Sequence, residues 1–288
     1  MSHNRLEAFF SVALLACAAV SIGSILLIAV FVSAPGLPLM MRIGPLSFLL
    51  GTEWAPLSGT FGILPMIAGS VMVTLGCLLL AVPLGVACAV YLAEFAPSSI
   101  AGVVRIALLV LSGIPSVVYG FYGLVVIVPA IREHLGGSGM SVLAGSVVLA
   151  IMVLPTIATI SEDAIKAVPG EYREGSMALG ATRWETVARV VAPAARSGII
   201  ASVVLGMGRA IGETMALIMV TGNSPRFPAR ITDMTRTLTG NIALEMGYAG
   251  GDHQRALFAT GMVLLVFIMI VNSVAIAVSK AGDRRGKP

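Results

Sequence analysis

Two ionisable side chains interrupt an otherwise apolar stretch in the second half of the chain. Arg209 and Glu213 lie within residues 198–221, where all other residues are apolar, small or hydroxyl-bearing. An ionised group at the middle of a membrane-spanning helix costs about 2.5–3.5 kcal/mol on insertion scales, so both groups need compensation. Four residues apart on a helix, the two side chains share one face and can pair. The spacing leaves two interpretations open, a structural ion pair between helices or charged groups that line a path for an anion.

Three hydroxyl groups recur at helical spacing in an earlier apolar stretch. Ser112, Ser116 and Tyr119 occupy positions i, i+4 and i+7, and therefore one face of a continuous helix. Pro115 lies among them, and because proline lacks a backbone N–H, it frees a carbonyl oxygen nearby. These hydroxyls either line a polar path or make ordinary hydrogen bonds between helices.

Groups that could catalyse a reaction are absent from the apolar stretches. The three histidines, His3, His134 and His253, lie outside them, and so do the aspartates. An intramembrane hydrolase needs a nucleophile with a base, or a metal cluster, at reachable depth, so the sequence argues against an enzyme. There is no G-x-x-x-x-G-K-[ST] phosphate loop, and we therefore expect no ATP hydrolysis by the chain itself. We expect it to bind no metal and no cofactor.

The composition indicates a membrane protein. Of the 288 residues, 57% are hydrophobic and 11% are charged, and the mean hydropathy is +0.98. This apolar excess excludes a water-soluble globule, and it also excludes low-complexity disorder, which needs few apolar residues. The net charge of +4 does not indicate a nucleic-acid partner, because the basic residues are scattered through loops without interleaved exposed aromatic residues.

Six apolar stretches, trimmed at proline and glycine residues, predict an all-α membrane protein with six transmembrane helices in a single domain. The expected spans are 8–33, 67–92, 103–130, 141–160, 198–221 and 256–279. Eleven lysines and arginines fall on the side that holds both termini and six on the other side, which predicts cytoplasmic termini. The first apolar run is too long for a cleaved signal peptide, so we expect the first span to stay attached.

On this topology the longest cytoplasmic segment is the loop 161–197. Pro169 and Gly170 break the chain there, and a short helix can begin at Glu171, whose carboxylate is favoured near a helix N-terminus. Gly180 offers a turn that ends this helix.

The same loop carries a resemblance to a known family. Glu174, Gly180 and Pro193 match the spacing of the loop typical of ABC importer permeases, which reads Glu-Ala-Ala, three residues, Gly, nine residues and Ile-x-Leu-Pro. Here Gly-Ser replaces the two alanines, Val replaces Ile and Ala replaces Leu. In that family the short helix docks into a groove of a cytoplasmic ATPase. The residues that the resemblance assigns to this coupling segment are Glu171, Glu174, Gly175, Ser176, Ala178, Gly180, Ala181 and Thr182.

Further stretches narrow the resemblance to the permeases of phosphate-specific importers. Residues 112–121 (SGIPSVVYGF) and 208–216 (GRAIGETMA) resemble both permease subunits of that family, and 222–225 (GNSP) is closer to the PstC type than to the PstA type. The resemblance implies a type I ABC importer permease fold that forms half of a path for phosphate. The path residues are then Arg209, Glu213, Thr214, Ser112, Ser116 and Tyr119.

The resemblance also implies the partners. They are a homologous PstA-like permease, two PstB-like cytoplasmic ATPases that bind ATP and magnesium, and an extracytoplasmic PstS-like phosphate-binding protein, all at the inner membrane of a bacterium or archaeon. A permease for another oxyanion, such as molybdate or sulfate, and the partner phosphate subunit are alternatives. A passive channel or a membrane scaffold would also explain six spans, but it would not explain the loop.

Overall fold

Long apolar helices make up most of the structure. The computed structural model describes the backbone of residues 2–284 and the side chains of residues 9–274 and 277. In this part of the chain five helices are long and apolar enough to cross a membrane. A sixth span results when the helix pair Arg183–Ala194 and Arg196–Gly212, bent by 69°, is taken as one. The number agrees with the six spans expected from the sequence, although this pair covers Arg183–Gly212 and the expected span was 198–221.

The helices α3 (Leu64–Val90) and α7 (Val142–Lys166) pack along each other at the centre of the bundle. A glycine permits this close packing, because a Cβ on Gly85 would lie 2.8 Å from the Ile157 Cγ2 atom. The start of α7 is fixed by Ser141, whose hydroxyl accepts a hydrogen bond from a backbone N–H of the first turn at 3.1 Å. α7 therefore has a fixed position from which its polar side chains can face a neighbour.

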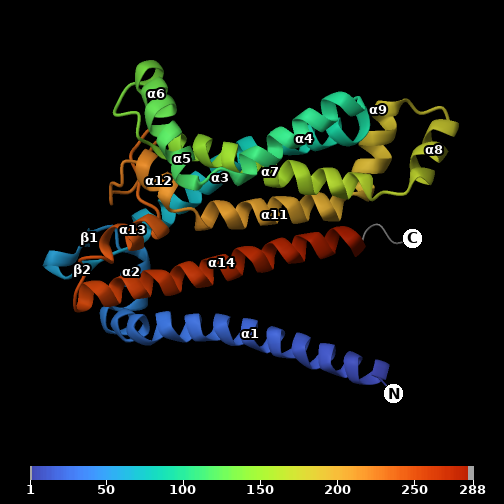
Figure 1. Cartoon of the computed structure of the whole chain (residues 1–288). Coiled ribbons are helices and arrows are strands. Elements are labelled where there is room, and N and C mark those ends of the chain that lie inside the picture. Colours follow the sequence, from blue (N-terminus) through green and yellow to red (C-terminus); the bar gives the residue numbers. More distant parts are fainter. Residues whose placement is uncertain (1, 285–288) are drawn as a thin grey trace.

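The helices α1 (Ser2–Ile43) and α14 (Asp252–Arg284) run beside each other at one edge of the bundle (Figure 1). They come close where a Cβ on Gly36 would lie 2.6 Å from the Ala259 amide nitrogen. The large apolar side chains in the N-terminal half of α1 are exposed, as expected of a helix that faces lipid.

The third apolar segment, expected as one continuous helix over 103–130, is broken. It consists of α4 (Ser98–Gly113), α5 (Ser116–Tyr122), the π-helical turn η3 (Gly123–Ile127) and α6 (Val128–Leu135). Ile114, between α4 and α5, is extended with a ψ of 130° because it precedes a proline, which disfavours the helical conformation. The expectation of one helix was wrong because this proline ends α4.

The fifth segment, expected over 198–221, is also broken. It consists of α11 (Arg196–Gly212) and α12 (Met215–Val220). Glu213, between them, is extended with a ψ of 133°. Its freed carbonyl accepts a hydrogen bond from the Thr239 hydroxyl at 3.0 Å, so a contact with a distant residue stabilises the break.

Short elements cover the two ends of the bundle. At one end lie α2 (Pro45–Leu50), β1 (Trp54–Ala55), η1 (Pro56–Ser58), β2 (Thr60–Phe61) and α13 (Leu238–Glu245). At the other lie η2 (Tyr91–Phe95), α8 (Gly170–Ala178), α9 (Arg183–Thr186), η4 (Val187–Val191) and α10 (Ala192–Ala194). The strands are antiparallel, with Trp54 paired to Phe61 and Ala55 to Thr60. Figure 1 shows α8 and α9 opposite the β1–β2 hairpin, at the end where α1 begins and α14 ends.

A buried carboxylate joins the elements around the hairpin. Glu245, at the end of α13, lies 2.8 Å from both Trp54 Nε1 and His253 Nε2 and 2.5 Å from Arg236 Nη1. Burial raises the pKa of the Glu245 carboxyl, but the hydrogen bonds from these three side chains outweigh it, and the pKa lies below its ordinary value. We call these four residues the Glu245 cluster.

The lowered pKa of Glu245 predicts a pH-dependent contribution to stability. A carboxyl whose pKa is lower in the folded state stabilises the fold above its unfolded value of 4.5, and this contribution is lost as the pH falls through the folded value. We expect Glu245→Gln to lower the Tm of the purified protein at neutral pH, and the difference in Tm to shrink as the pH falls below 4.5. The exposed Glu133→Gln serves as the control, and a difference that is equal at every pH would contradict the prediction.

Candidate functional site

Two broken helices meet in the region where the sequence places its candidate residues. α5 begins directly after the break of the third segment, α12 directly after the break of the fifth, and the two helices pack together. Their backbones are close, because a Cβ on Gly120 would lie 2.8 Å from Ala216 Cα. The first N–H groups of a helix have no partner within the helix, so each break adds polar backbone groups to an apolar bundle.

Arg209 lies in the last turn of α11 and points toward α7. Its Nη1 atom is 3.5 Å from the Thr156 hydroxyl, which makes a long hydrogen bond. The ion pair with Glu213 that the sequence suggested does not form. The Glu213 carboxylate instead accepts a hydrogen bond from the Ala216 N–H of α12 at 3.1 Å, while the Arg209 guanidinium contacts Thr156 of α7.

Glu213 accepts hydrogen bonds at the break through both its backbone and its side chain. Its Oε1 atom accepts the Ala216 N–H at 3.1 Å, and its carbonyl oxygen accepts from Thr239. The neighbouring Thr214 stands at the N-cap position of α12, and its hydroxyl donates to the Gly212 carbonyl at 3.2 Å. The carboxylate thus lies at the positive end of α12, where a negative charge is favoured.

The sequence predicted that the three hydroxyls of the third segment share one helical face. They do not, because the break separates Ser112 from Ser116 and Tyr119. Ser112 bonds its hydroxyl to the Leu109 carbonyl within α4, while Ser116 is the first residue of α5. Tyr119 donates to the Leu111 carbonyl at 2.6 Å. Pro115 has no N–H to donate to that carbonyl, which accepts the Ile114 N–H at 3.3 Å and the tyrosine hydroxyl instead.

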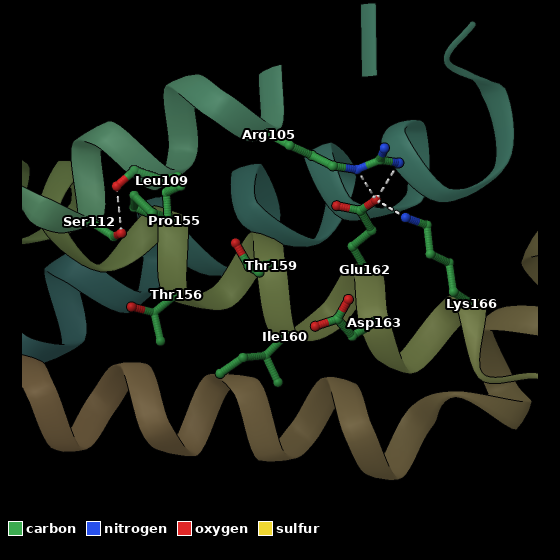
Figure 2. A pocket seen from close by; sticks show the side chains of 10 residues that line it. All are labelled: Arg105, Leu109, Ser112, Pro155, Thr156, Thr159, Ile160, Glu162, Asp163 and Lys166. Atoms are coloured by element: carbon green, nitrogen blue, oxygen red, sulfur yellow. Dashed lines mark hydrogen bonds and ion pairs between the residues drawn. The ribbon is translucent and has the colours of Figure 1, made fainter. Parts of the chain in front are cut away.

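A cavity of about 430 Å³ extends between α4 and α7 from this region (Figure 2). Ser112 and Thr156 line one part of it, so the cavity adjoins the hydroxyl that Arg209 contacts. In another part, Glu162 pairs with Arg105 at 2.7 Å and Lys166 at 2.5 Å. Sequence reasoning missed the pairing of Arg105 with Glu162, although Arg105 is the single charged residue between Glu94 and Arg132.

The expected short helix of the loop 161–197 is present as α8. It begins directly after Pro169, and it ends before Gly180, whose φ of +88° forms the left-handed turn that the sequence predicts. Thr182 then caps α9 in a capping box with Glu185. The exposed residues of the coupling segment are Glu171, Glu174, Gly175, Ala178, Gly180 and Thr182, and the half-buried ones are Ser176 and Ala181.

A largely buried ion pair between Arg173 and Glu94 attaches α8 to η2, the turn that follows α3. The guanidinium of Arg173 donates to Glu94 Oε1 at 2.6 Å and 2.9 Å, and to the carbonyls of Ile165 and Val168 at 2.9 Å and 2.7 Å. Arg183 also donates to the Glu94 carbonyl. Sequence reasoning missed the Arg173–Glu94 ion pair, although a carboxylate that directly follows a long charge-free run indicates a buried partner.

Comparison with known proteins identifies the family. Residues 81–285 match the family described as the binding-protein-dependent transport system inner membrane component. The chain belongs to this family of ABC importer permeases, and it is a multi-pass protein of the inner membrane.

Several relatives are similar over most of the chain. The probable ABC transporter permease protein YqgH of Bacillus subtilis is 43% identical, covering 89% of this chain and 86% of that protein. The phosphate transport system permease protein PstC of Haemophilus influenzae is 35% identical, with coverages of 84% and 83%. PstC 1 of Mycobacterium tuberculosis is 34% identical, with coverages of 86% for this chain and 86% for that protein.

Solved structures confirm the fold class. A bacterial ABC transporter that imports the acidic polysaccharide alginate has a TM-score of 0.63 at 14% identity, covering 92% of this chain and 95% of that one. The MetNI methionine ABC transporter has a TM-score of 0.57 at 19% identity, with coverages of 77% and 94%. The chain has the type I ABC importer permease fold.

The Arg173–Glu94 ion pair predicts that losing one partner destabilises the protein more than losing both. Arg173→Met leaves the Glu94 carboxylate buried without its partner, and we expect a loss of about 3–5 kcal/mol in the free energy of unfolding. The double variant Glu94→Leu with Arg173→Met removes both charges, and its Tm should recover part of the loss. Thermal unfolding of the purified protein measures both effects, and a single variant as stable as the parent would contradict the prediction.

Proposed function

We propose that this chain is a permease subunit of an ATP-driven phosphate importer, in which it forms half of the path for phosphate. The observation that carries the proposal is Arg209, whose guanidinium lies at a helix break inside the apolar bundle and is directed to a hydroxyl rather than to Glu213. A guanidinium at low dielectric is a strong, forked partner for phosphate oxygens. The names of the PstC relatives support phosphate as the anion.

Glu213 provides a basis for choosing among oxyanions. Its Oε1 atom is held by the Ala216 N–H, and among the described residues no donor is bonded to Oε2. Phosphate carries a proton at neutral pH and can donate a hydrogen bond to this oxygen, whereas fully ionised sulfate cannot. This favours phosphate over sulfate or molybdate, which are the alternative substrates. The PstC relatives also favour this subunit over its PstA-type partner.

Membership of the family supports the partners that we propose. A homologous PstA-like permease would form the other half of the path, and a PstS-like binding protein would deliver phosphate from outside. Two PstB-like ATPases would bind ATP and magnesium, so the chemistry of hydrolysis would lie outside this chain. We infer that α8, with its exposed end, docks on one of these ATPases, and that both termini therefore lie in the cytoplasm, as the distribution of basic residues also indicates.

Phosphate uptake tests the role of Arg209. We expect Arg209→Ala to reduce uptake about 10- to 100-fold without loss of the assembled complex, because hydrogen bonds to charged groups contribute about 1.5–3 kcal/mol. Excess sulfate and molybdate should not compete with phosphate in the parent. Uptake is compared in membranes with equal amounts of complex, and substantial uptake by the double variant Arg209→Met with Glu213→Leu would contradict the role.

Co-purification of the ATPase tests the coupling segment and the orientation together. Gly180→Val forces a β-branched residue to a φ of +88°, and Glu174→Lys reverses a charge on the exposed face of α8, so both variants should lose the ATPase. Gly170→Val is the matched control, because a Cβ meets open space at both glycines and Gly170 has no positive φ. Normal co-purification and phosphate-stimulated hydrolysis in the Gly180 and Glu174 variants would contradict docking through α8.

A further inference from the structure

The short helix α13, of eight residues, contacts two polar networks. One is the break between α11 and α12, and the other is the Glu245 cluster. The first turn of α13 reaches the break between α11 and α12, and its last residue is Glu245. In Figure 1 it lies between α12 and the β1–β2 hairpin. At a rise of about 1.5 Å per residue, the two networks are about 9 Å apart along the helix axis.

The contact with the break is made by one hydroxyl. Thr239 Oγ1 donates to the Glu213 carbonyl at 3.0 Å, and its residue is only 8% exposed. The break removes the helical N–H that this carbonyl would otherwise accept from, and a buried carbonyl without a donor is costly. The hydroxyl therefore stabilises the extended conformation of Glu213 relative to the helical one.

The position of this hydroxyl is itself fixed. Thr237 caps α13 by accepting the Gly240 N–H at 3.1 Å, and it also lies 3.1 Å from the Thr239 hydroxyl. The Leu238 N–H donates to Ser70 of α3 at 2.9 Å. The start of α13 is thus attached to a central helix of the bundle, and movement of the break relative to α3 must change the Thr239 contact.

The other end of α13 holds the segment that follows α12. Arg236, a member of the Glu245 cluster, donates from Nε to the Asn223 carbonyl at 2.9 Å. Asn223 in turn donates to the Ile218 carbonyl of α12 at 2.7 Å. α12 is therefore held at its start through Thr239 and at its end through the Glu245 cluster.

We propose that Thr239 is a positioning residue for transport. Its hydroxyl holds the break in the conformation that presents Arg209 and Glu213 to the substrate. α13 couples this conformation to the Glu245 cluster beside the β1–β2 hairpin. The inference rests on the proposed function, because it takes Arg209 and Glu213 as the groups that meet phosphate.

The first experiment removes the hydroxyl alone. Thr239→Val keeps the shape of the side chain, and we expect phosphate uptake per assembled complex to fall at least tenfold. Thr239→Ser retains the donor and should keep most of the uptake. Thr260→Val is the matched control. Thr260 is fully buried, and its one side-chain hydrogen bond among the described residues lies within α14, to the Ala256 carbonyl at 2.9 Å. This variant should transport phosphate at the parental rate.

The outcomes separate the two hypotheses. A parent complex that takes up no phosphate contradicts the proposed function. A parent that transports phosphate, with a Thr239→Val variant that transports equally well per complex, overturns the positioning role. Uptake that falls equally in Thr239→Val and Thr260→Val overturns it as well, because it would show only the general cost of losing a buried hydroxyl.

A double-mutant cycle tests the coupling through α13. If the helix transmits position, Glu245→Gln and Thr239→Val disturb the same state, and the fall in uptake of the double variant is smaller than the product of the single effects. Independent effects, in which the fold-changes multiply, would overturn the coupling. Normalising uptake to the assembled complex separates these effects from losses in folding.

Discussion

Backbone hydrogen bonding inside an apolar environment is the constraint on which this structure depends. A helix that crosses a membrane can be broken only where other groups replace the lost hydrogen bonds, because lipid offers no donor or acceptor. At the first break the Tyr119 hydroxyl donates to the Leu111 carbonyl beside the Ile114 N–H, and at the second the Thr239 hydroxyl donates to the Glu213 carbonyl. These two side chains allow α5 and α12 to start inside the bundle. Arg209 and Glu213 lie at the second break, in the last turn of α11 and directly after it.

Buried carboxylates hold the ends of the bundle in a similar way. Glu94, Glu162 and Glu245 are each less than a tenth exposed, and each has at least one cation as partner. Glu94 attaches α8 to η2, and Glu245 attaches α13 to the hairpin and α14. Such pairs define relative position more than they add stability, because desolvation offsets much of the Coulomb attraction. They lie where elements that must keep their geometry during transport meet the bundle.

The amino-acid pattern predicted the features that depend on local chemistry. Apolar run length located the long helices, and Gly180 indicated a left-handed turn because glycine adopts positive φ at little cost. The breaks could not be predicted in the same way. A proline is tolerated within α7 at Pro155, whereas Pro115 ends α4, so the presence of a proline does not by itself locate a break. The Glu213 break depends on Thr239, which lies 26 residues away in the sequence. Spacing alone allowed Arg209 to pair with Glu213, but it could not show that the Glu213 carboxylate accepts the Ala216 N–H instead.

The loose attachment of α1 has a consequence for how its sequence can vary. Its large side chains between Phe9 and Phe31 face outward and form few contacts with the rest of the described chain, so they are constrained by hydrophobicity and not by shape. Exchanges among leucine, isoleucine, valine and phenylalanine there should accumulate freely over evolutionary time. Gly36 is different, because its Cα hydrogen faces the backbone at Ala259. One small residue therefore fixes where α1 crosses α14, while the rest of the helix is free to match the thickness and composition of the surrounding lipid.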